Sequence, residues 1–250
     1  MTKTIDINSA LGEGIGNAEA IMPFISSANI ACGAHAGNPL LMERTVRLAK
    51  QYGVQIGAHP GYADAENFGR IEMQLPPGEI EELVLQQVAA LAGIARANGC
   101  EMAHVKAHGA LYNQAAKDRV LADAIVRAVK RFNRELILYG LAGSQLIAAG
   151  LDAGLRVASE GFPDRAYESD GSLRSRKMPG ALIDDPQQAA VNGLRLASEG
   201  ISIQGKKGEE RLRVNTLCVH GDSPGAVETA KALKEILEKN HFKIVSLNKI

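Results

Sequence analysis

Seven short runs with β-strand character recur along the chain, and each is followed by polar or glycine-rich residues and then by a longer helical pattern. The runs are TIDIN (4–8), SANIA (27–31), VQIGA (54–58), AHVKA (103–107), LILYG (136–140), RVASE (156–160) and TLCVH (216–220). Strands that alternate with helices predict repeated βα units and a mainly parallel sheet. A length of 250 residues is usual for one β/α barrel. We therefore expect a single α/β domain, a TIM-like (β/α) barrel, over residues 1–250.

The segments between these runs have the apolar spacing of amphipathic helices that pack outside a sheet. In residues 78–99 one face is apolar, and Gly99 is placed to end the helix. The apolar positions of that face are Ile80, Leu83, Val84, Val88, Leu91 and Ile94. Two further helices open with Asp185-Pro186 and Ser223-Pro224, pairs that suit an N-cap followed by the first helical residue.

Two segments leave alternatives open. The polar run GKKGEERLRV, residues 205–214, is typical of a hairpin or of a loop insertion. The run FKIVSL, residues 242–247, could pair beside the first strand and close the sheet as an eighth strand, but no helix follows it, so it could equally be an edge strand. The sequence therefore predicts a barrel of seven or eight strands.

Composition excludes several classes of partner. Lys plus Arg equals Asp plus Glu at 28 each, so we expect neither nucleic acid nor an acidic membrane surface as a partner. No export signal and no run of about 18 apolar residues is present, which predicts a soluble, cytoplasmic protein. Three widely spaced cysteines without a C-x-x-C pair indicate reduced thiols rather than disulfides or a zinc knuckle.

Residues that ionise or bind metal stand at or just beyond the C-terminal ends of most predicted strands. They are Asp6, Asn8, Glu13, His35, His59, Lys106, His108, Glu160, Asp164, Arg165, His220 and Asp222. In parallel βα folds this end of the sheet binds ligands, because the βα loops and helix N-termini converge there. One such histidine would be ordinary in a surface or core position, but several at one level predict an active site.

The stretch VKAHGALYN, residues 105–113, adds detail to this prediction. If the strand is regular, His104, Lys106 and His108 lie on one face and can point into a barrel mouth. The loop of residues 57–70 carries His59 and Arg70, and it either covers a site or is an irregular surface loop.

The residue types limit the chemistry of such a site. Imidazole can act as a base, an acid or a metal ligand, and Lys106 can hold a substrate carboxylate or stabilise an oxyanion. The zincin, α/β-hydrolase and P-loop motifs are absent from the sequence. The glycines at 12, 14 and 16 resemble a dinucleotide fingerprint only loosely, because the second predicted strand ends in ACGAHAG without the acid of a Rossmann site, so a tight βα turn is the better interpretation.

Long motifs in this chain resemble those of the LamB/YcsF family, whose members are described as the A subunit of 5-oxoprolinase. They include IDINSALGEGIG, SANIACGAHAGNP, GVQIGAHPGY, HVKAHGALYN, RVASEGFPDRAYESDGSL and LCVHGDSP, and the likeness runs nearly from end to end. The resemblance implies a β/α barrel of the glycoside hydrolase/deacetylase type. It also implies ATP-dependent cleavage of 5-oxo-L-proline (pyroglutamate) to L-glutamate together with partner subunits B and C. The family's motif residues fall on Asp6, Glu13, His35, His59, Lys106, His108, Glu160, His220 and Asp222.

Three positions depart from the family's pattern. The family usually writes D-L-N-x-D-x-G-E, and Ala10 replaces the second acid. It usually writes C-G-x-H-A-G-D-P, and Asn38 replaces the last acid, while Ala107 stands where proline is common. Hard cations need anionic oxygen, so losing two carboxylates should weaken a divalent cation site. The chain either works without metal, binds it through Asp6, His35 and His59, or has reduced activity.

Roles within the predicted site remain partly open. The general base is one of Asp6, Glu13, His35 and His108, and Lys106 binds the substrate carboxylate. Further substrate contacts are predicted for Asn8, His59, Arg70, Asn113, Glu160, Arg165, His220 and Asp222. Two other functions are considered, a metal-dependent N-deacetylase-like amide hydrolase and a noncatalytic binding subunit of the complex.

Overall fold

In the computed structural model, which describes residues 3–15, 18–205, 208–221 and 225–249, seven parallel strands form a closed barrel. Their order is β1-β2-β3-β4-β5-β6-β9, and β9 pairs with β1 to close the ring. The strands are β1 (Lys3–Leu11), β2 (Ser27–Ala31), β3 (Gln55–His59), β4 (Met102–Lys106), β5 (Ile137–Leu141), β6 (Val157–Gly161) and β9 (Thr216–Val219). All seven predicted strand runs are confirmed.

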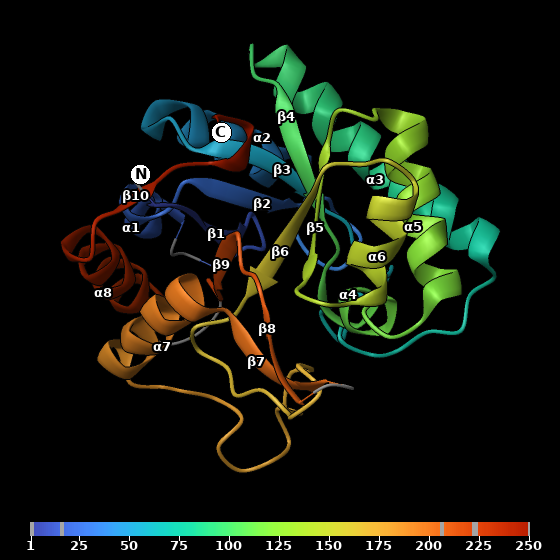
Figure 1. The fold of residues 1–250 in the computed structure, drawn as a ribbon. Coiled ribbons are helices and arrows are strands. Elements are labelled where there is room, and N and C mark those ends of the chain that lie inside the picture. The colour runs from blue at the N-terminus through green and yellow to red at the C-terminus, as the bar shows by residue number, and fades with distance from the viewer. Residues whose placement is uncertain (1–2, 16–17, 206–207, 222–224, 250) are drawn as a thin grey trace.

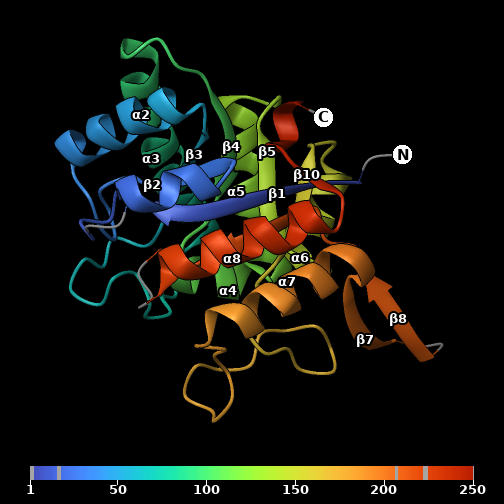
Figure 2. The same ribbon diagram turned by 90° about the vertical axis from the view of Figure 1, so that its left-hand side faces the viewer.

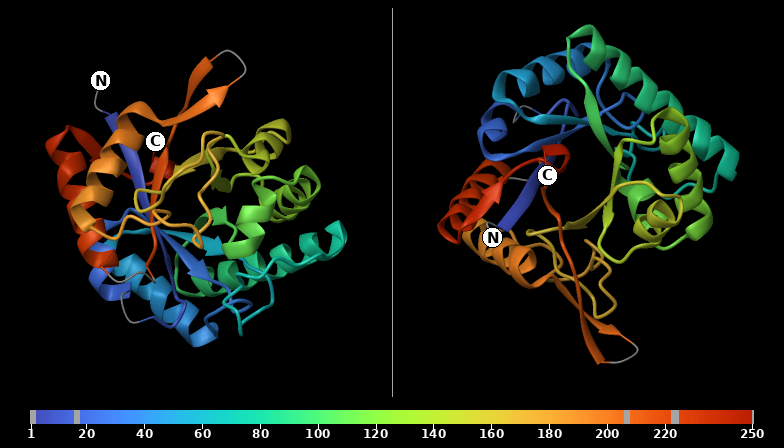
Figure 3. Two further views of the ribbon diagram at one scale, coloured as in Figure 1. Left: turned by 90° about the horizontal axis from the view of Figure 1, so that it is seen from below. Right: turned by 45° about the horizontal axis from the view of Figure 1, so that its top comes forward.

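Helices cover the outside of the barrel (Figures 1 and 3). They are α1 (Ala18–Ile21), α2 (Pro39–Tyr52), α3 (Pro77–Ala97), α4 (Gly109–Ala115), α5 (Arg119–Phe132), α6 (Gln145–Asp152), α7 (Pro186–Glu199) and α8 (Ala226–Lys239), with short 3-10 turns at Met22–Phe24 and Leu247–Lys249. Each long helix buries apolar side chains, such as Val84 and Leu91 on α3 and Ile125 and Val129 on α5.

Local signals explain several helix boundaries. The Asp185 side chain accepts a hydrogen bond from the backbone N–H of Gln188 and caps α7, as predicted. Gly99 follows α3 with a φ of 66°, the left-handed conformation that favours glycine. Helix α8 begins at Ala226 after Gly225, whereas Ser223 and Pro224 lie outside the described residues.

The two ambiguous segments are resolved. Strand β10 (Phe242–Ile244) pairs in parallel with Lys3–Ile5, the part of β1 that precedes its pairing with β9. It therefore extends the sheet at the start of β1 and is not an eighth strand of the closed barrel. Strands β7 (Ile201–Gly205) and β8 (Gly208–Leu212) form an antiparallel hairpin that projects from the barrel (Figure 2), so the hairpin alternative is confirmed.

Alternation along β1 divides the barrel into an apolar outer layer and a polar interior. Ile5 and Ile7 belong to the hydrophobic core, whereas Asp6 and Asn8 bond to side chains of other barrel strands. Polar interior groups are costly unless they are hydrogen-bonded to one another. None of the described helices is long and apolar enough to cross a membrane.

Candidate active site inside the mouth of the barrel

Hydroxyl groups surround the Asp6 carboxylate deep in the barrel. Its Oδ1 accepts hydrogen bonds from Ser26 Oγ at 2.6 Å and Ser27 Oγ at 2.7 Å. Its Oδ2 accepts from Thr216 Oγ1 at 2.6 Å and from Tyr139 Oη at 3.0 Å. Burial raises the pKa of Asp6, although these donors oppose the rise. Both carboxylate oxygens are thus engaged by the protein itself.

A chain of side-chain hydrogen bonds joins His104, Asn29 and Asn8 inside the barrel. His104 Nε2 donates to Asn29 Oδ1 at 2.8 Å, and Asn29 Nδ2 donates to Asn8 Oδ1 at 2.7 Å. The His104 ring stacks on Tyr139 with centroids 4.4 Å apart. Burial lowers the pKa of His104 to about 3, and Lys106 adds to this effect. His104 is therefore a neutral group packed inside the barrel.

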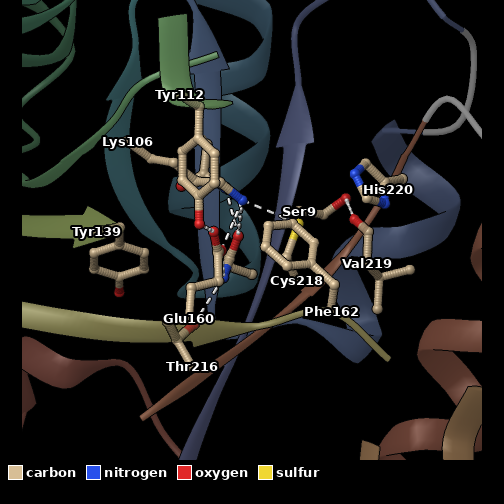
Figure 4. Close-up of polar contacts among 12 residues, drawn as sticks. Ser9, Lys106, Tyr112, Tyr139, Glu160, Phe162, Thr216, Cys218, Val219 and His220 are labelled. Carbon is tan, nitrogen blue, oxygen red and sulfur yellow. Dashed lines mark hydrogen bonds and ion pairs between the residues drawn. The ribbon is translucent and has the colours of Figure 1, made fainter. Parts of the chain in front are cut away.

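Lys106 is the centre of a buried polar cluster (Figure 4). Its Nζ donates to Glu160 Oε1 at 2.7 Å, to Asn8 Oδ1 at 3.1 Å and to Cys218 Sγ at 3.0 Å. Burial by itself would lower the pKa of Lys106, but the Glu160 carboxylate opposes burial and the net pKa is raised. Burial raises the pKa of the Cys218 thiol to about 12, so this thiol is neutral near pH 7. All three ammonium hydrogens of Lys106 have a partner within the protein.

Tyr112 completes this cluster and was not predicted as a site residue. Its Oη donates to Glu160 Oε2 at 2.8 Å, and Figure 4 shows its ring pointing down at that carboxylate from α4. Asn8 Nδ2 donates to Glu160 Oε1 at 2.8 Å. Burial and the nearby Glu160 raise the pKa of Tyr112, so it acts as a hydrogen-bond donor. Glu160 is held on both oxygens.

A second cluster, which we call the histidine cluster, consists of Glu13, His35, His59 and His108. His35 stacks face to face on His108, with ring centroids 3.7 Å apart, and its Nε2 lies 3.4 Å from Glu13 Oε1. The same Glu13 oxygen lies 3.5 Å from His108 Nδ1, and His108 Nδ1 lies 3.1 Å from His59 Nε2. His59 is the last residue of β3, whereas His35 and His108 lie in the connections after β2 and β4, and the barrel brings the three rings into contact.

Burial controls the protonation of this cluster. It lowers the pKa of His35 to about 4, with a contribution from Arg70. It also lowers the pKa of His108 to about 4 and that of His59 well below its usual value, and the neighbouring imidazoles add to both shifts. The rings are therefore neutral near pH 7 and available as bases or ligands.

His220 and Asp164 form a separate pair at the mouth. His220 Nδ1 donates to Asp164 Oδ2 at 2.6 Å, and the imidazole stacks on Phe162 with centroids 5.4 Å apart. Burial would raise the pKa of Asp164, but His220 outweighs it and the net pKa is lowered. Lys106 Nζ lies 5.3 Å from the centroid of Phe162. The Phe162 ring therefore lies between the polar cluster around Lys106 and the His220 imidazole (Figure 4).

The remaining predicted residues occupy varied positions. Arg70 lies over the ring of Phe68 at 4.9 Å, next to the histidine cluster. Asn113 is exposed on α4, and Asp222 lies outside the described residues. Arg165 is buried and donates to the backbone carbonyls of Arg174 and Ala181. Arg165 therefore fastens the loop that follows β6.

Asn38 and Ala10, which replace two acids of the family pattern, lie in different parts of the structure. Asn38 is the N-cap of α2, and its Oδ1 accepts from the backbone N–H of Leu41 at 3.0 Å. An exposed cap is not part of the polar interior, so the missing acid at this position does not remove a carboxylate from the barrel. Ala10 follows Asp6 and Asn8 on the same face of β1. The missing acid at position 10 therefore removes a carboxylate from the polar interior.

Access to the site is narrow. His35, His59, Lys106 and His108 are each no more than 6% exposed. A cavity of about 350 Å³ lies elsewhere, between α7, β7 and residues 165–169, and among its described lining residues Arg165 alone is a predicted site residue. We place the candidate site in the barrel mouth because the ionisable groups converge there.

Among the described residues, one group of ligand atoms is close enough to hold a metal ion. The group is Glu13, His59 and His108, whose ligand atoms lie within 4.8 Å of one another. The predicted set of Asp6, His35 and His59 is not brought together in this way. Only His59 belongs to both sets.

Comparison with known proteins gives a full-length match. The model of the LamB/YcsF family matches residues 5–250. A protein of Chloroflexus aggregans, named as the A subunit of 5-oxoprolinase, is 51% identical over 240 residues, covering 94% of this chain and 95% of the relative. A protein of Syntrophobacter fumaroxidans with the same name is 47% identical over 249 residues, covering 97% and 98%.

Solved structures agree at the level of the fold. The lactam utilization protein of Thermus thermophilus is similar with a TM-score of 0.90 and 43% identity, covering 98% of this chain and all of that one. An Enterococcus faecalis V583 protein named for cellobiose-phosphate cleavage has a TM-score of 0.57 at 11% identity, covering 100% and 99% of the chains. The T48 deacetylase has a TM-score of 0.52 at 14% identity, covering 99% and 90%. The last two share the β/α-barrel fold alone.

Proposed function

The chain belongs to the LamB/YcsF family, and we propose that it is the A subunit of a 5-oxoprolinase. Together with partner subunits B and C it hydrolyses 5-oxo-L-proline to L-glutamate, with ATP as the co-substrate of the complex. The observation that carries this proposal is the identity of 47–51% to proteins named as the A subunit of 5-oxoprolinase, over at least 93% of this chain. The lactam utilization protein of similar structure supports the same substrate class.

The chemistry of the substrate explains why ATP is needed. A five-membered lactam is an unstrained and stable amide, and phosphorylation of its carbonyl oxygen makes the carbonyl carbon open to attack by water. Breaking the ring C–N bond then leaves an acyl phosphate, which a second water molecule hydrolyses to glutamate and inorganic phosphate. The sequence of this chain lacks a P-loop motif, so we assign that phosphorylation to the partner subunits and hydrolysis to this one.

We assign different steps of the hydrolysis to the histidine cluster and to the pair formed by His220 and Asp164. In the histidine cluster, the Glu13 carboxylate and the neutral imidazoles beside it are suited to accept hydrogen bonds from the attacking water and to orient it. Asp6 is less suited to this role, because four hydroxyls already occupy its oxygens. On the other side of the mouth, His220 oriented by Asp164 is suited to protonate the leaving nitrogen as the ring opens.

Lys106 acts through its charge. Its three partners leave no hydrogen for a substrate carboxylate, which alters the role predicted from the sequence. A buried ammonium group still stabilises negative charge that develops on the substrate nearby. Arg70, beside the histidine cluster, is the cation that we assign to the substrate carboxylate.

The test is reconstitution of the full chain with subunits B and C and measurement of glutamate released from 5-oxoproline and ATP. We expect release that requires all three subunits and falls at least a hundredfold with His108→Ala. Val191→Ala, an exposed apolar substitution on α7, is the matched control and should leave the rate unchanged. Undiminished turnover with His108→Ala would remove that residue from the mechanism, and no glutamate from the wild-type complex would refute the function.

The group of Glu13, His59 and His108 favours a second candidate, a metal-dependent amide hydrolase. A divalent ion held by these residues would polarise the amide carbonyl and make attack by water easier without ATP. Glutamate release by the isolated chain without ATP would favour this candidate over the first. A third outcome, tight binding of 5-oxoproline without turnover in the reconstituted complex, would make the chain a noncatalytic binding subunit.

A further inference from the structure

His59 and His108 each use one ring nitrogen on a backbone carbonyl. His59 Nδ1 lies 2.8 Å from the carbonyl oxygen of Lys106, and His108 Nε2 lies 2.8 Å from the carbonyl oxygen of Phe68. A carbonyl oxygen can only accept, so the hydrogen-bond network assigns a hydrogen to each of these two nitrogens. In a neutral imidazole the other nitrogen then carries a lone pair. These lone pairs belong to His59 Nε2 and His108 Nδ1.

The two lone-pair nitrogens face each other. They are 3.1 Å apart, and two acceptors at that distance repel unless a cation lies between them. Burial of both rings opposes an additional proton. Two imidazole nitrogens bound to one tetrahedral zinc ion at about 2.0–2.1 Å are about 3.3 Å apart. The observed separation is close to that value, so the pair is arranged to share a metal ion.

Glu13 supplies a negative charge at the same point. Its Oε1 lies 3.5 Å from His108 Nδ1, and the three ligand atoms are within 4.8 Å of one another. His35 Nε2, 3.4 Å from that oxygen, helps to orient the carboxylate. Carbonyl groups that fix the outer nitrogen of each imidazole are the usual second layer of a histidine metal site. Two histidines and one carboxylate leave coordination positions open for water or substrate.

From these contacts we propose that Glu13, His59 and His108 bind one divalent transition-metal ion of the Zn²⁺, Co²⁺ or Ni²⁺ type. Two imidazole ligands favour such ions over Mg²⁺ and Ca²⁺, which prefer oxygen. Asp6 is not a ligand, because its oxygens accept from four hydroxyls. The absence of acids at positions 10 and 38 is compatible with this site, since neither position contributes to it. The proposal concerns ion binding by this chain alone, so it can fail separately from the proposed reaction.

The test uses the full chain stripped with a chelator and titrated with Co²⁺, whose visible absorption reports imidazole coordination. We expect one saturable ion per chain and a rise in the melting temperature on adding Zn²⁺. His59→Ala, His108→Ala and the conservative Glu13→Gln should each weaken Co²⁺ binding by more than tenfold. His220→Ala, which removes an imidazole from the other side of the mouth, is the matched control and should bind as the wild type does.

Three results would overturn the site. The first is the absence of saturable Co²⁺ or Zn²⁺ binding by folded wild-type protein. The second is unchanged affinity in both His59→Ala and Glu13→Gln. If the alanine variants do not fold, Glu13→Gln with a native circular dichroism spectrum decides the outcome by itself. Stabilisation by Mg²⁺ but not by Zn²⁺ would also contradict a site built on two imidazoles.

Discussion

Lys106 Nζ lies 2.7 Å from Glu160 Oε1, and both side chains are sealed inside the barrel. Removing one partner of a buried ion pair leaves an uncompensated charge, which typically costs about 3–5 kcal/mol. We expect Lys106→Met to lower the free energy of unfolding by that amount in urea titrations. The double variant with Glu160→Gln should lose less than the sum of the two single losses, because the charge left behind is also removed.

A surface ion pair provides the control for this prediction. Arg47 and Glu43 lie 2.7 Å apart on α2 but are 68% and 40% exposed. Arg47→Ala should therefore cost less than about 1 kcal/mol. Equal losses in Lys106→Met and Arg47→Ala would mean that the barrel pair is hydrated in solution.

Asp164 is a positioning residue for His220. Its carboxylate accepts from His220 Nδ1 at 2.6 Å, which directs the other ring nitrogen away from Asp164. Asp164→Asn should lower kcat for glutamate release by the reconstituted complex by about 10²-fold, with a much smaller change in KM. Adding Asp164→Asn to His220→Ala should have no further effect, since both act through one imidazole. A fully additive loss would place Asp164 in a separate role.

The strands could be predicted because both faces of a closed parallel barrel are covered, which gives short runs rich in apolar residues. The common level of the histidines near the strand ends followed from the same argument, because parallel strands end at one edge. Asp6 is a correction to that prediction: β1 continues to Leu11, and Asp6 pairs with Thr216, the first residue of β9, so it lies near the opposite end of the barrel. The inward face of His104 and Lys106 also followed from strand alternation, whereas β4 ends at Lys106 and His108 is the N-cap residue of α4. For these features the local sequence contained the information that the fold uses.

Hydrogen-bond partners could not be predicted in the same way. The Tyr139 and Thr216 hydroxyls bond to Asp6 from 133 and 210 positions away, and nothing in either local sequence identifies the partner. Tyr112 lies in the stretch VKAHGALYN, but the sequence favours its polar neighbour Asn113 as the site residue. A helical turn directs only one of two adjacent side chains into the barrel, and the buried one is Tyr112.

His104 makes stability depend on pH. The pKa of a histidine in the unfolded chain is about 6.5, whereas burial lowers that of His104 to about 3. The unfolded state therefore takes up a proton below pH 6.5 and the folded state does not, so stability falls as the pH drops from 6.5 toward 3. The loss is about 1.4 kcal/mol for each pH unit.

The variant His104→Gln isolates this contribution. Urea titrations at pH 7 and pH 5 should show a loss of stability that is smaller in the variant than in the wild type by about 2 kcal/mol. The other buried histidines remain in both proteins and cancel in the comparison. Identical losses would show that His104 takes up a proton without unfolding.

Gly57 is required by the ring of His104. A Cβ atom at Gly57 would lie 2.1 Å from His104 Nε2, and that ring is packed against Tyr139 and bonded to Asn29. Gly57→Ala should therefore cost about 1–3 kcal/mol or more. A Cβ atom added at Gly93, in the exposed face of α3, would meet no neighbouring side chain within 4 Å, so Gly93→Ala should stabilise by about 0.5–1 kcal/mol. Thermal melts of the two variants should shift in opposite directions.

Asn38 tests whether the acid missing from the second motif matters to the site. Its Oδ1 caps α2 through the backbone N–H of Leu41, so Asn38→Ala should cost about 0.5–2 kcal/mol. Asn38→Asp keeps the acceptor and adds a negative charge at the helix N-terminus, which should stabilise by about 0.3–1 kcal/mol. Because the side chain is an exposed cap, neither change should alter glutamate release at a temperature where both variants are folded. A rise in turnover with Asn38→Asp would show instead that a carboxylate at this position reaches the reacting groups.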